Sequence, residues 1–229
     1  MPPTGHHPAP PPHFDLTDTL VLFDWNGTLV ADTDRAVRAT NAVLADRGLP
    51  ALTDEEFRSR WVLPMRAFLH GLGADDTDAA EQRWNRALAA EPAPLRPHAH
   101  PTLDILRAHG ARLGVISAAG AQAVEADLHT TGLHDRFDVV IAGCRDKTTA
   151  LREQRSTRSR ACYIGDTEYD IRSAHTAGYL AVAITGGYRP ADALAAVRPD
   201  AVVDRLDELP GVLAYLRNTT EPAPTGGPA

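Results

Sequence analysis

The chain has 229 residues, of which 43% are hydrophobic and 23% are charged, and this length suits one large domain or a core with a smaller inserted module. Asp and Glu outnumber Lys and Arg by 30 to 23, and the net charge of −7 disfavours a general nucleic-acid binder. The sequence has no apolar run near the ~18 residues of a membrane helix, no secretory signal and no disulfide framework from its two cysteines. We therefore expect a soluble, cytoplasmic protein without membrane or nucleic-acid partners.

Short apolar runs of four to six residues predict the strands of a buried parallel sheet, because they are apolar on both faces. These runs are residues 19–23, 113–116, 137–141, 161–164 and 180–185. Helical patterns separate the runs after residue 100. This alternation predicts an α/β fold with a doubly wound, Rossmann-like parallel sheet.

The segment between the first run and the others has no strand pattern. It contains three helical patterns: one at 36–47, one that starts at a capping box at 53–56, and one that follows Thr77 and Asp78 and continues through Ala90. We predict that this segment is an all-helical cap domain over the carboxyl end of the first strand, where α/β sheets bind ligands. The predicted parts are a core at 16–33 and 95–218, the cap at 34–94, and disordered tails at 1–15 and 219–229.

The first predicted strand leads into Asp24, which is followed by Trp25, Asn26, Gly27 and Thr28. A carboxylate at the end of a buried strand is placed for chemistry, Gly27 permits a tight turn, and Thr28 offers a hydroxyl to the turn or to an anion. Asn-Gly is also an ordinary turn dipeptide, so this string alone leaves a purely structural role open.

Two further signals follow later strands. Ser117 ends the second strand and leads through Ala118 into a helix, where a hydroxyl and backbone N–H groups can bind a phosphate, although serine is also a common helix cap. Lys147 follows the third strand, and it is the single lysine among 23 basic residues, the others being arginine. A lone lysine is usually a solvated surface group. Lysine is also a compact point charge that can lie between two anions. Because the chain has arginine at its other basic positions, the lysine at 147 favours that role.

Asp166 and Asp170 form the most specific signal. They lie at the end of the fourth strand and in the first turn of the next helix, so both carboxylates can point into one pocket. There they repel each other unless a cation lies between them or they retain protons, and oxygen ligands suit Mg²⁺. The alternative is that Asp166 is a turn residue and Asp170 an ordinary acid at a helix N-terminus.

All four signals lie at the carboxyl ends of predicted strands or in the loops beyond them, so they can converge. Their order along the chain is an Asp, a hydroxyl residue, a lysine and a pair of Asp residues. This order resembles the haloacid dehalogenase-like hydrolase superfamily, in its phosphatase branch with a helical cap and a phosphoglycolate phosphatase-like architecture. The resemblance covers nearly all of residues 19–217, and the motifs match apart from one position.

The resemblance implies a role for each matching residue. Asp24 is expected to be the nucleophile that forms an aspartyl-phosphate, while Ser117 and Lys147 hold the phosphoryl oxygens. The cofactor implied is Mg²⁺, which screens the repulsion between the nucleophile and an anionic substrate. The implied Mg²⁺ ligands are Asp24, the main-chain carbonyl of Asn26, Asp166 and Asp170.

The candidate substrate contacts are Trp25, Thr28, Ala118 and Arg66. Trp25 either lines the pocket or packs in the core. Arg66 in the cap either contacts an anionic part of the substrate or lies on a solvated helix face. The chain has no second lysine for the Schiff base of phosphonate-cleaving relatives, and the paired Asp residues argue against the metal-independent dehalogenases.

The position that departs from the family pattern is Asn26, which we include among the catalytic residues. Phosphatases of this superfamily usually have a second Asp there as general acid and base, a role worth ~10²–10⁴-fold that an amide does not fill. Three explanations of Asn26 are open. Another group, such as one from the cap, supplies the proton; the enzyme is slow or acts on substrates with good leaving groups; or the protein binds phosphate with little turnover. Deamidation of Asn26-Gly27 is a further alternative. We therefore expect a Mg²⁺-dependent phosphohydrolase for a small phosphorylated metabolite, with a catalytically weak phosphate-binding or regulatory protein as the alternative.

Overall fold

The computed structural model describes residues 14–155 and 157–220, and its centre is a six-stranded, entirely parallel sheet. The strands are β1 (Thr19–Phe23), β2 (Arg112–Ile116), β3 (Val139–Ile141), β4 (Arg160–Gly165), β5 (Leu180–Ile184) and β6 (Ala201–Val203). Their order across the sheet is β3-β2-β1-β4-β5-β6. The chain therefore moves outward from β1 in one direction and then in the other, so the predicted doubly wound α/β fold is confirmed.

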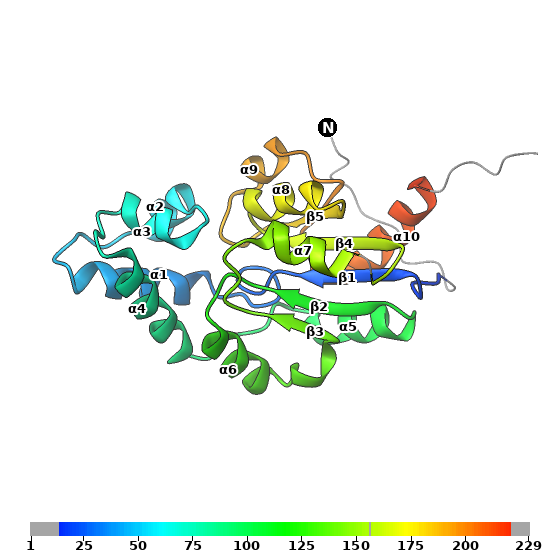
Figure 1. Ribbon diagram of the computed structural model, residues 1–229, viewed down its shortest axis with the longest axis horizontal. Helices are drawn as coiled ribbons and strands as arrows, with labels where there is room; N and C mark the ends of the chain where they lie inside the picture. The colour runs from blue at the N-terminus through cyan, green and yellow to red at the C-terminus, as the bar shows by residue number, and fades with distance from the viewer. Residues whose placement is uncertain (1–13, 156, 221–229) are drawn as a thin grey trace, which may run out of the picture.

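Helices cover both faces of this sheet (Figure 1). Side chains of β1 alternate between the two faces: Val21 and Phe23 belong to one hydrophobic cluster, and Leu20 and Leu22 to the other. The first cluster includes side chains of α5 (Ala99–Ala108), α6 (Ala121–Thr131) and α10 (Leu209–Thr220). The second includes side chains of α7 (Lys147–Arg155), α8 (Glu168–Thr176) and α9 (Ala191–Ala196).

Four helices follow β1 before the chain returns to the sheet. They are α1 (Thr33–Ala45), α2 (Asp54–Arg60), α3 (Met65–Gly71) and α4 (Thr77–Ala89). Figure 1 shows them as a separate layer beyond the carboxyl ends of the strands. The capping box predicted at the start of the second helix is present, with the Thr53 hydroxyl accepting from the backbone of Glu56 and the Glu56 carboxylate accepting from the backbone of Thr53.

The structure adds elements that the sequence patterns did not predict. Strand β6 has only three residues and lies at the edge of the sheet, and α3 has only seven residues, so neither produces a clear periodic signal. Two short 3₁₀ turns also occur, at His134–Arg136 and Leu206–Glu208. The described tail boundaries also differ from those expected. Phe14 stacks on His109 with ring centroids 4.1 Å apart, and α10 continues through Thr220; the remaining tail residues, 1–13 and 221–229, lie outside the described part of the chain.

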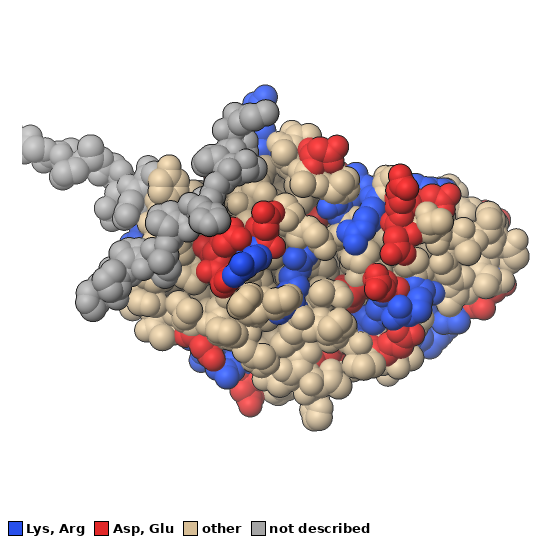
Figure 2. Space-filling view, turned by 180° about the vertical axis from the view of Figure 1, so that it is seen from behind, with Lys and Arg blue, Asp and Glu red and all other residues tan. Residues whose placement is uncertain are grey.

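The surface carries mixed charge. On the part of the face in Figure 2 that the described residues form, basic side chains lie beside acidic ones and make no extended basic patch of the kind that binds a nucleic-acid backbone. Within residues 14–155 and 157–220, no helix is both long and apolar enough to span a membrane.

Candidate active site

The residues of the four sequence signals meet at the carboxyl edge of the sheet. Asp24 directly follows β1, Ser117 follows β2, and Asp166 follows β4, and all three strands are neighbours at the centre of the sheet. Lys147 is the first residue of α7, and Asp170 lies in the first turn of α8. Since parallel strands end at the same edge, the fold brings together residues that are more than 140 positions apart in sequence.

Lys147 lies between two carboxylates. Its Nζ is 2.8 Å from Oδ1 of Asp24 and 2.6 Å from Oδ1 of Asp170, and its side chain is almost completely buried. Burial alone disfavours a charged lysine, but attraction to Asp170 and Asp24 outweighs that cost and raises the pKa of Lys147. Lys147 is therefore a fixed, fully charged cation beside Asp24.

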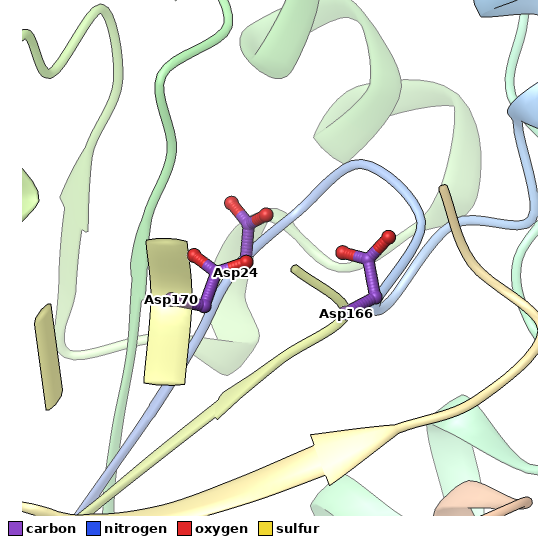
Figure 3. Close-up of side chains that lie close together, drawn as sticks. All are labelled: Asp24, Asp166 and Asp170. Carbon is purple, nitrogen blue, oxygen red and sulfur yellow. The ribbon is translucent and has the colours of Figure 1, made fainter. Parts of the chain in front are cut away.

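The carboxylates of Asp24, Asp166 and Asp170 form a compact acidic cluster (Figure 3). One oxygen from each lies within 4.8 Å of the others, and all three residues are buried. Burial first, and then the charge of Asp170, raise the pKa of Asp166 to about 7. Burial also raises the pKa of Asp24 well above its usual value, with Lys147 opposing and the other two carboxylates adding to the shift. Three acids with one lysine leave uncompensated negative charge, which fits a divalent cation with oxygen ligands.

Two glycines fit closely around Asp166. A Cβ atom at Gly27 or at Gly187 would lie 2.2 Å from Oδ2 of Asp166, so a larger residue at either position displaces this carboxylate. Gly27 also has a φ of +74°, a conformation that side chains disfavour. Asp166 is held in this cradle by Thr28 Oγ1, which donates at 3.0 Å, and by the backbone N–H of Tyr188, which donates at 2.6 Å. The donors and the tight backbone therefore fix the orientation of the Asp166 carboxylate.

Asp170 caps the start of α8 and also contacts Lys147. Its Oδ2 accepts from the backbone and the hydroxyl of Thr167, which makes a capping box at the start of α8. Its Oδ1 accepts from Lys147. Asp170 therefore starts the helix and holds the lysine, and both functions place its carboxylate beside Asp24.

Asn26 lies in the site, but its amide group is held by the protein. The side-chain Nδ2 donates to Oδ2 of Asp32 at 2.6 Å, while Oδ1 is buried and has no hydrogen-bond partner. Asp32 also accepts from the backbone N–H of Gly27 and from the hydroxyl of Tyr188. The orientation of the amide is therefore set, with the nitrogen on Asp32 and the oxygen left as an acceptor.

A buried ionic network supports this arrangement. Arg35 lies between two carboxylates, with Nη2 3.0 Å from Oδ2 of Asp32 and Nη1 2.7 Å from Oδ1 of Asp127. Burial raises the pKa of Asp32 even though Arg35 opposes the shift. Trp25 completes the network, because its indole N–H donates to Oδ2 of Asp127 at 3.0 Å.

Of the four residues expected to contact substrate, one lines the pocket, two are buried in the core and one lies at the surface of the cap. Ala118 lines the pocket described below. Thr28 is fully buried and donates to Asp166, and Trp25 is fully buried and donates to Asp127 of the Arg35 network, so both make supporting contacts within the protein. Arg66 pairs with Asp78 and with Glu81 at the cap surface.

A pocket lies between the sheet edge and the cap helices. Asp24, Ser117 and Lys147 form part of its wall on the sheet side, and Trp61, Met65 and Trp84 form part of its wall on the cap side. Tyr188, from the loop after β5, connects the two walls: its ring contacts Phe57 and Trp61 edge-on, with centroids 5.4 Å and 4.8 Å away. Motif reasoning did not identify Asp32, Arg35, Gly187 or Tyr188, and only the folded chain brings them to the site.

Comparison with known proteins identifies the family of the chain. The family model for haloacid dehalogenase-like hydrolases matches residues 21–184. The chain belongs to this family. A phosphoglycolate phosphatase of Synechococcus elongatus is 29% identical over 199 residues, covering 82% of this chain and 94% of the relative. A probable phosphatase, IndB, of Dickeya dadantii is 27% identical, covering 89% and 97% of the two chains.

The solved structures show the same fold. The crystal structure of a predicted phosphoglycolate phosphatase from Haemophilus somnus superposes with a TM-score of 0.73 at 21% identity, covering 85% of this chain and 97% of that one. Together with family membership, these matches confirm the prediction of a phosphoric monoester hydrolase at the level of enzyme class.

Proposed function

We propose that this protein is a Mg²⁺-dependent cytoplasmic phosphohydrolase that acts on a small phosphorylated metabolite through an aspartyl-phosphate on Asp24. The observation that carries the proposal is the position of Lys147 between Asp24 and Asp170, inside a buried cluster of three carboxylates. Apolar residues would stabilise the fold at this position with a smaller desolvation penalty, so the buried charges point to a function. The cluster suits an anionic substrate that must approach an anionic nucleophile.

The residues expected to hold Mg²⁺ are Asp24, Asp166 and Asp170, together with the main-chain carbonyl of Asn26. The ion would neutralise phosphoryl and carboxylate charge when bound. The close fit of Gly27 and Gly187 around Asp166 supports this assignment, because the backbone keeps one carboxylate from turning away.

In the proposed reaction, a carboxylate oxygen of Asp24 attacks phosphorus and the bond between phosphorus and the leaving oxygen breaks. Lys147 and the hydroxyl of Ser117 neutralise and orient the phosphoryl oxygens as charge moves. Water then attacks phosphorus, the bond to Asp24 breaks, and inorganic phosphate leaves. Helices α1–α4 act as the cap that limits access of other water to the site.

Asn26 has no acidic proton to give, so the leaving oxygen takes its proton from water or departs as an anion. This makes the leaving group's own acidity important for the rate. A second candidate, a phosphate-binding protein with little turnover, rests on the same observation, namely the amide of Asn26 fixed on Asp32.

The test is release of inorganic phosphate from p-nitrophenyl phosphate by the purified chain. We expect turnover with Mg²⁺, loss of turnover with EDTA, and loss in Asp24→Asn, which keeps the shape of the side chain. Phosphate binding without turnover in the wild-type protein would favour the second candidate. Full turnover in Asp24→Asn would refute the proposed nucleophile.

A further inference from the structure

We propose that the pocket selects phosphoesters whose organic part is uncharged and hydroxylated, and that it disfavours phosphocarboxylates such as phosphoglycolate. This inference rests on the proposed function, since it takes the phosphoryl group to lie at Asp24, Ser117 and Lys147. It concerns the part of the substrate next to that group, which the cap side of the pocket would contact.

The charge of the pocket is the first argument. Among the described residues that line it, Lys147 is the single cation, and it already forms ion pairs with Asp24 and Asp170. The cap side contributes apolar walls, one neutral amide, Asn85, and one acid, Glu81. Lys147 and the proposed Mg²⁺ serve the phosphoryl group and the acidic cluster, so a carboxylate one carbon away from the phosphoryl oxygen would lose its water without gaining a cationic side chain of its own, and that loss is costly.

The cations of the neighbouring outer pocket do not change this conclusion. The outer pocket has a free volume of about 550 Å³, against about 30 Å³ for the inner one, and it shares Glu81 and Met65 with it. Its Arg66 already pairs with Asp78 and Glu81, and its other cation, Arg145, is exposed. Neither arginine lines the inner pocket, which is the part of the site beside Asp24 and Lys147.

Unpartnered polar atoms are the second argument. The described residues contain three buried side-chain polar atoms without a partner, and two of them belong to residues that line this pocket: Oδ1 of Asn26 and Nε1 of Trp61. Both side chains are more than nine-tenths buried, with Asn26 7% and Trp61 5% exposed. Because a buried polar group without a partner is costly, we infer that a bound ligand pairs with both.

The chemistry of these two atoms specifies the ligand. Asn26 does not flip its amide, because Nδ2 is held by Asp32 at 2.6 Å, so Oδ1 only accepts. It therefore suits a hydroxyl that donates. The Trp61 indole only donates, and it suits a hydroxyl or ether oxygen. A phosphorylated alcohol with further hydroxyl groups meets both requirements, and its C–H faces suit the aromatic wall.

The closing experiment compares two matched substrates: 2-hydroxyethyl phosphate and phosphoglycolate, which differ by a hydroxymethyl group against a carboxylate. We expect kcat/KM for 2-hydroxyethyl phosphate to exceed that for phosphoglycolate by at least about tenfold, equivalent to about 1.4 kcal/mol. Dissociation constants measured on Asp24→Asn, which leaves the esters intact, should show the same preference. Equal or reversed values in both measurements would overturn the inference.

Two variants separate the donor from the aromatic wall. Trp61→Phe keeps a ring but removes the unpartnered N–H, and we expect it to weaken binding of 2-hydroxyethyl phosphate more than binding of inorganic phosphate. Trp84→Phe is the matched control, because the Trp84 indole already donates to Oγ1 of Thr40 at 3.1 Å. This variant should leave the ratio between the two ligands unchanged. The same change of ratio in both variants would contradict the role of Trp61.

Hydrolysis of p-nitrophenyl phosphate distinguishes failure of this inference from failure of the proposed function. If that ester is hydrolysed and phosphoglycolate is the better of the two matched substrates, the inference is wrong and the proposed function stands. If no ester is hydrolysed with Mg²⁺, the proposed function is wrong, and the dissociation constants still decide the preference of the pocket.

Discussion

Replacing Asn26 by Asp tests how the site manages without an acid at this position. Nδ2 of Asn26 lies 2.6 Å from Oδ2 of Asp32, so Asn26→Asp puts a carboxylate oxygen in the place of the amide nitrogen. Two unit charges at that separation repel by about 6 kcal/mol at an effective dielectric constant of about 20. One pKa unit corresponds to about 1.36 kcal/mol, so this repulsion alone equals between about 4 and 5 units.

Arg35 reduces this repulsion without removing it. Its guanidinium pairs with Asp32 at 3.0 Å, but it is shared with Asp127 at 2.7 Å. The variant would therefore have three buried carboxyl groups around one guanidinium. Such a group retains a proton at neutral pH, and the variant acquires the acid that the wild-type chain lacks.

The expected result is a gain of activity that depends on the leaving group. We expect kcat/KM for an alkyl phosphate to rise at least tenfold, within the range of about 10²–10⁴ that general acid–base catalysis supplies. The gain for p-nitrophenyl phosphate should be smaller, because nitrophenolate leaves without a proton. The assay is steady-state phosphate release for both esters over a series of pH values.

Two controls isolate the acid. Asn26→Ala removes the amide without adding an acid, so it should not raise activity. Adding Asp32→Asn to Asn26→Asp removes the neighbouring charge and should shift the pH profile of the gain toward lower pH. An alkyl phosphate rate in Asn26→Asp at or below that of the wild type, with the fold retained by circular dichroism, would refute the reasoning.

Four further predictions follow from the contacts of Asp166 and of Trp25. Gly187→Ala places a Cβ atom 2.2 Å from Oδ2 of Asp166, so we expect it to abolish the Mg²⁺-induced rise in Tm; Gly71→Ala, where a Cβ would meet nothing within 4 Å, should retain that rise. The rise should be larger at about pH 8 than at about pH 6, because the pKa of Asp166 is raised to about 7 and its proton must leave before Mg²⁺ binds. A Mg²⁺-induced rise in Tm that does not vary with pH would contradict this expectation. Without Mg²⁺, the contribution of Asp166 to the free energy of unfolding should decrease as the pH rises from about 3.8, its unperturbed pKa, to about 7, because the folded state binds the proton more tightly than the unfolded chain. Trp25→Phe should lower the free energy of unfolding by about 1.5–3 kcal/mol, because the hydrogen bond to the Asp127 carboxylate is lost. Its KM should stay near the wild-type value, and a large rise in KM would show instead that Trp25 contacts the substrate.

The sheet and the acidic cluster were predictable from sequence for a physical reason. Buried parallel strands are continuous apolar runs, and residues directly after them share one edge of the sheet. Asp24 and Asp166 both follow such runs, and Lys147 stands out as the single lysine of the chain. Strand β6 was missed because three residues at a sheet edge carry too little of this pattern.

The groups that hold Asn26 were not predictable in the same way. Arg35 and Asp127 are 92 positions apart, and Tyr188 lies 156 positions from Asp32. Each looks like an ordinary surface or loop residue in its local sequence. Their burial and pairing arise only when the cap helices and the loop after β5 pack on the sheet edge. Sequence patterns therefore identified Asp24 as a candidate and missed the residues that orient its neighbour Asn26.

The central claim is that Asp24 accepts the phosphoryl group. Its most direct test is a single-turnover reaction with p-nitrophenyl phosphate and Mg²⁺, quenched in acid and followed by mass spectrometry of the peptide that contains Asp24. The account predicts a transient phosphoryl group on Asp24 that is absent with EDTA. Complete release of phosphate with no phosphoryl group on that peptide at any time, together with full activity of Asp24→Asn, would contradict it.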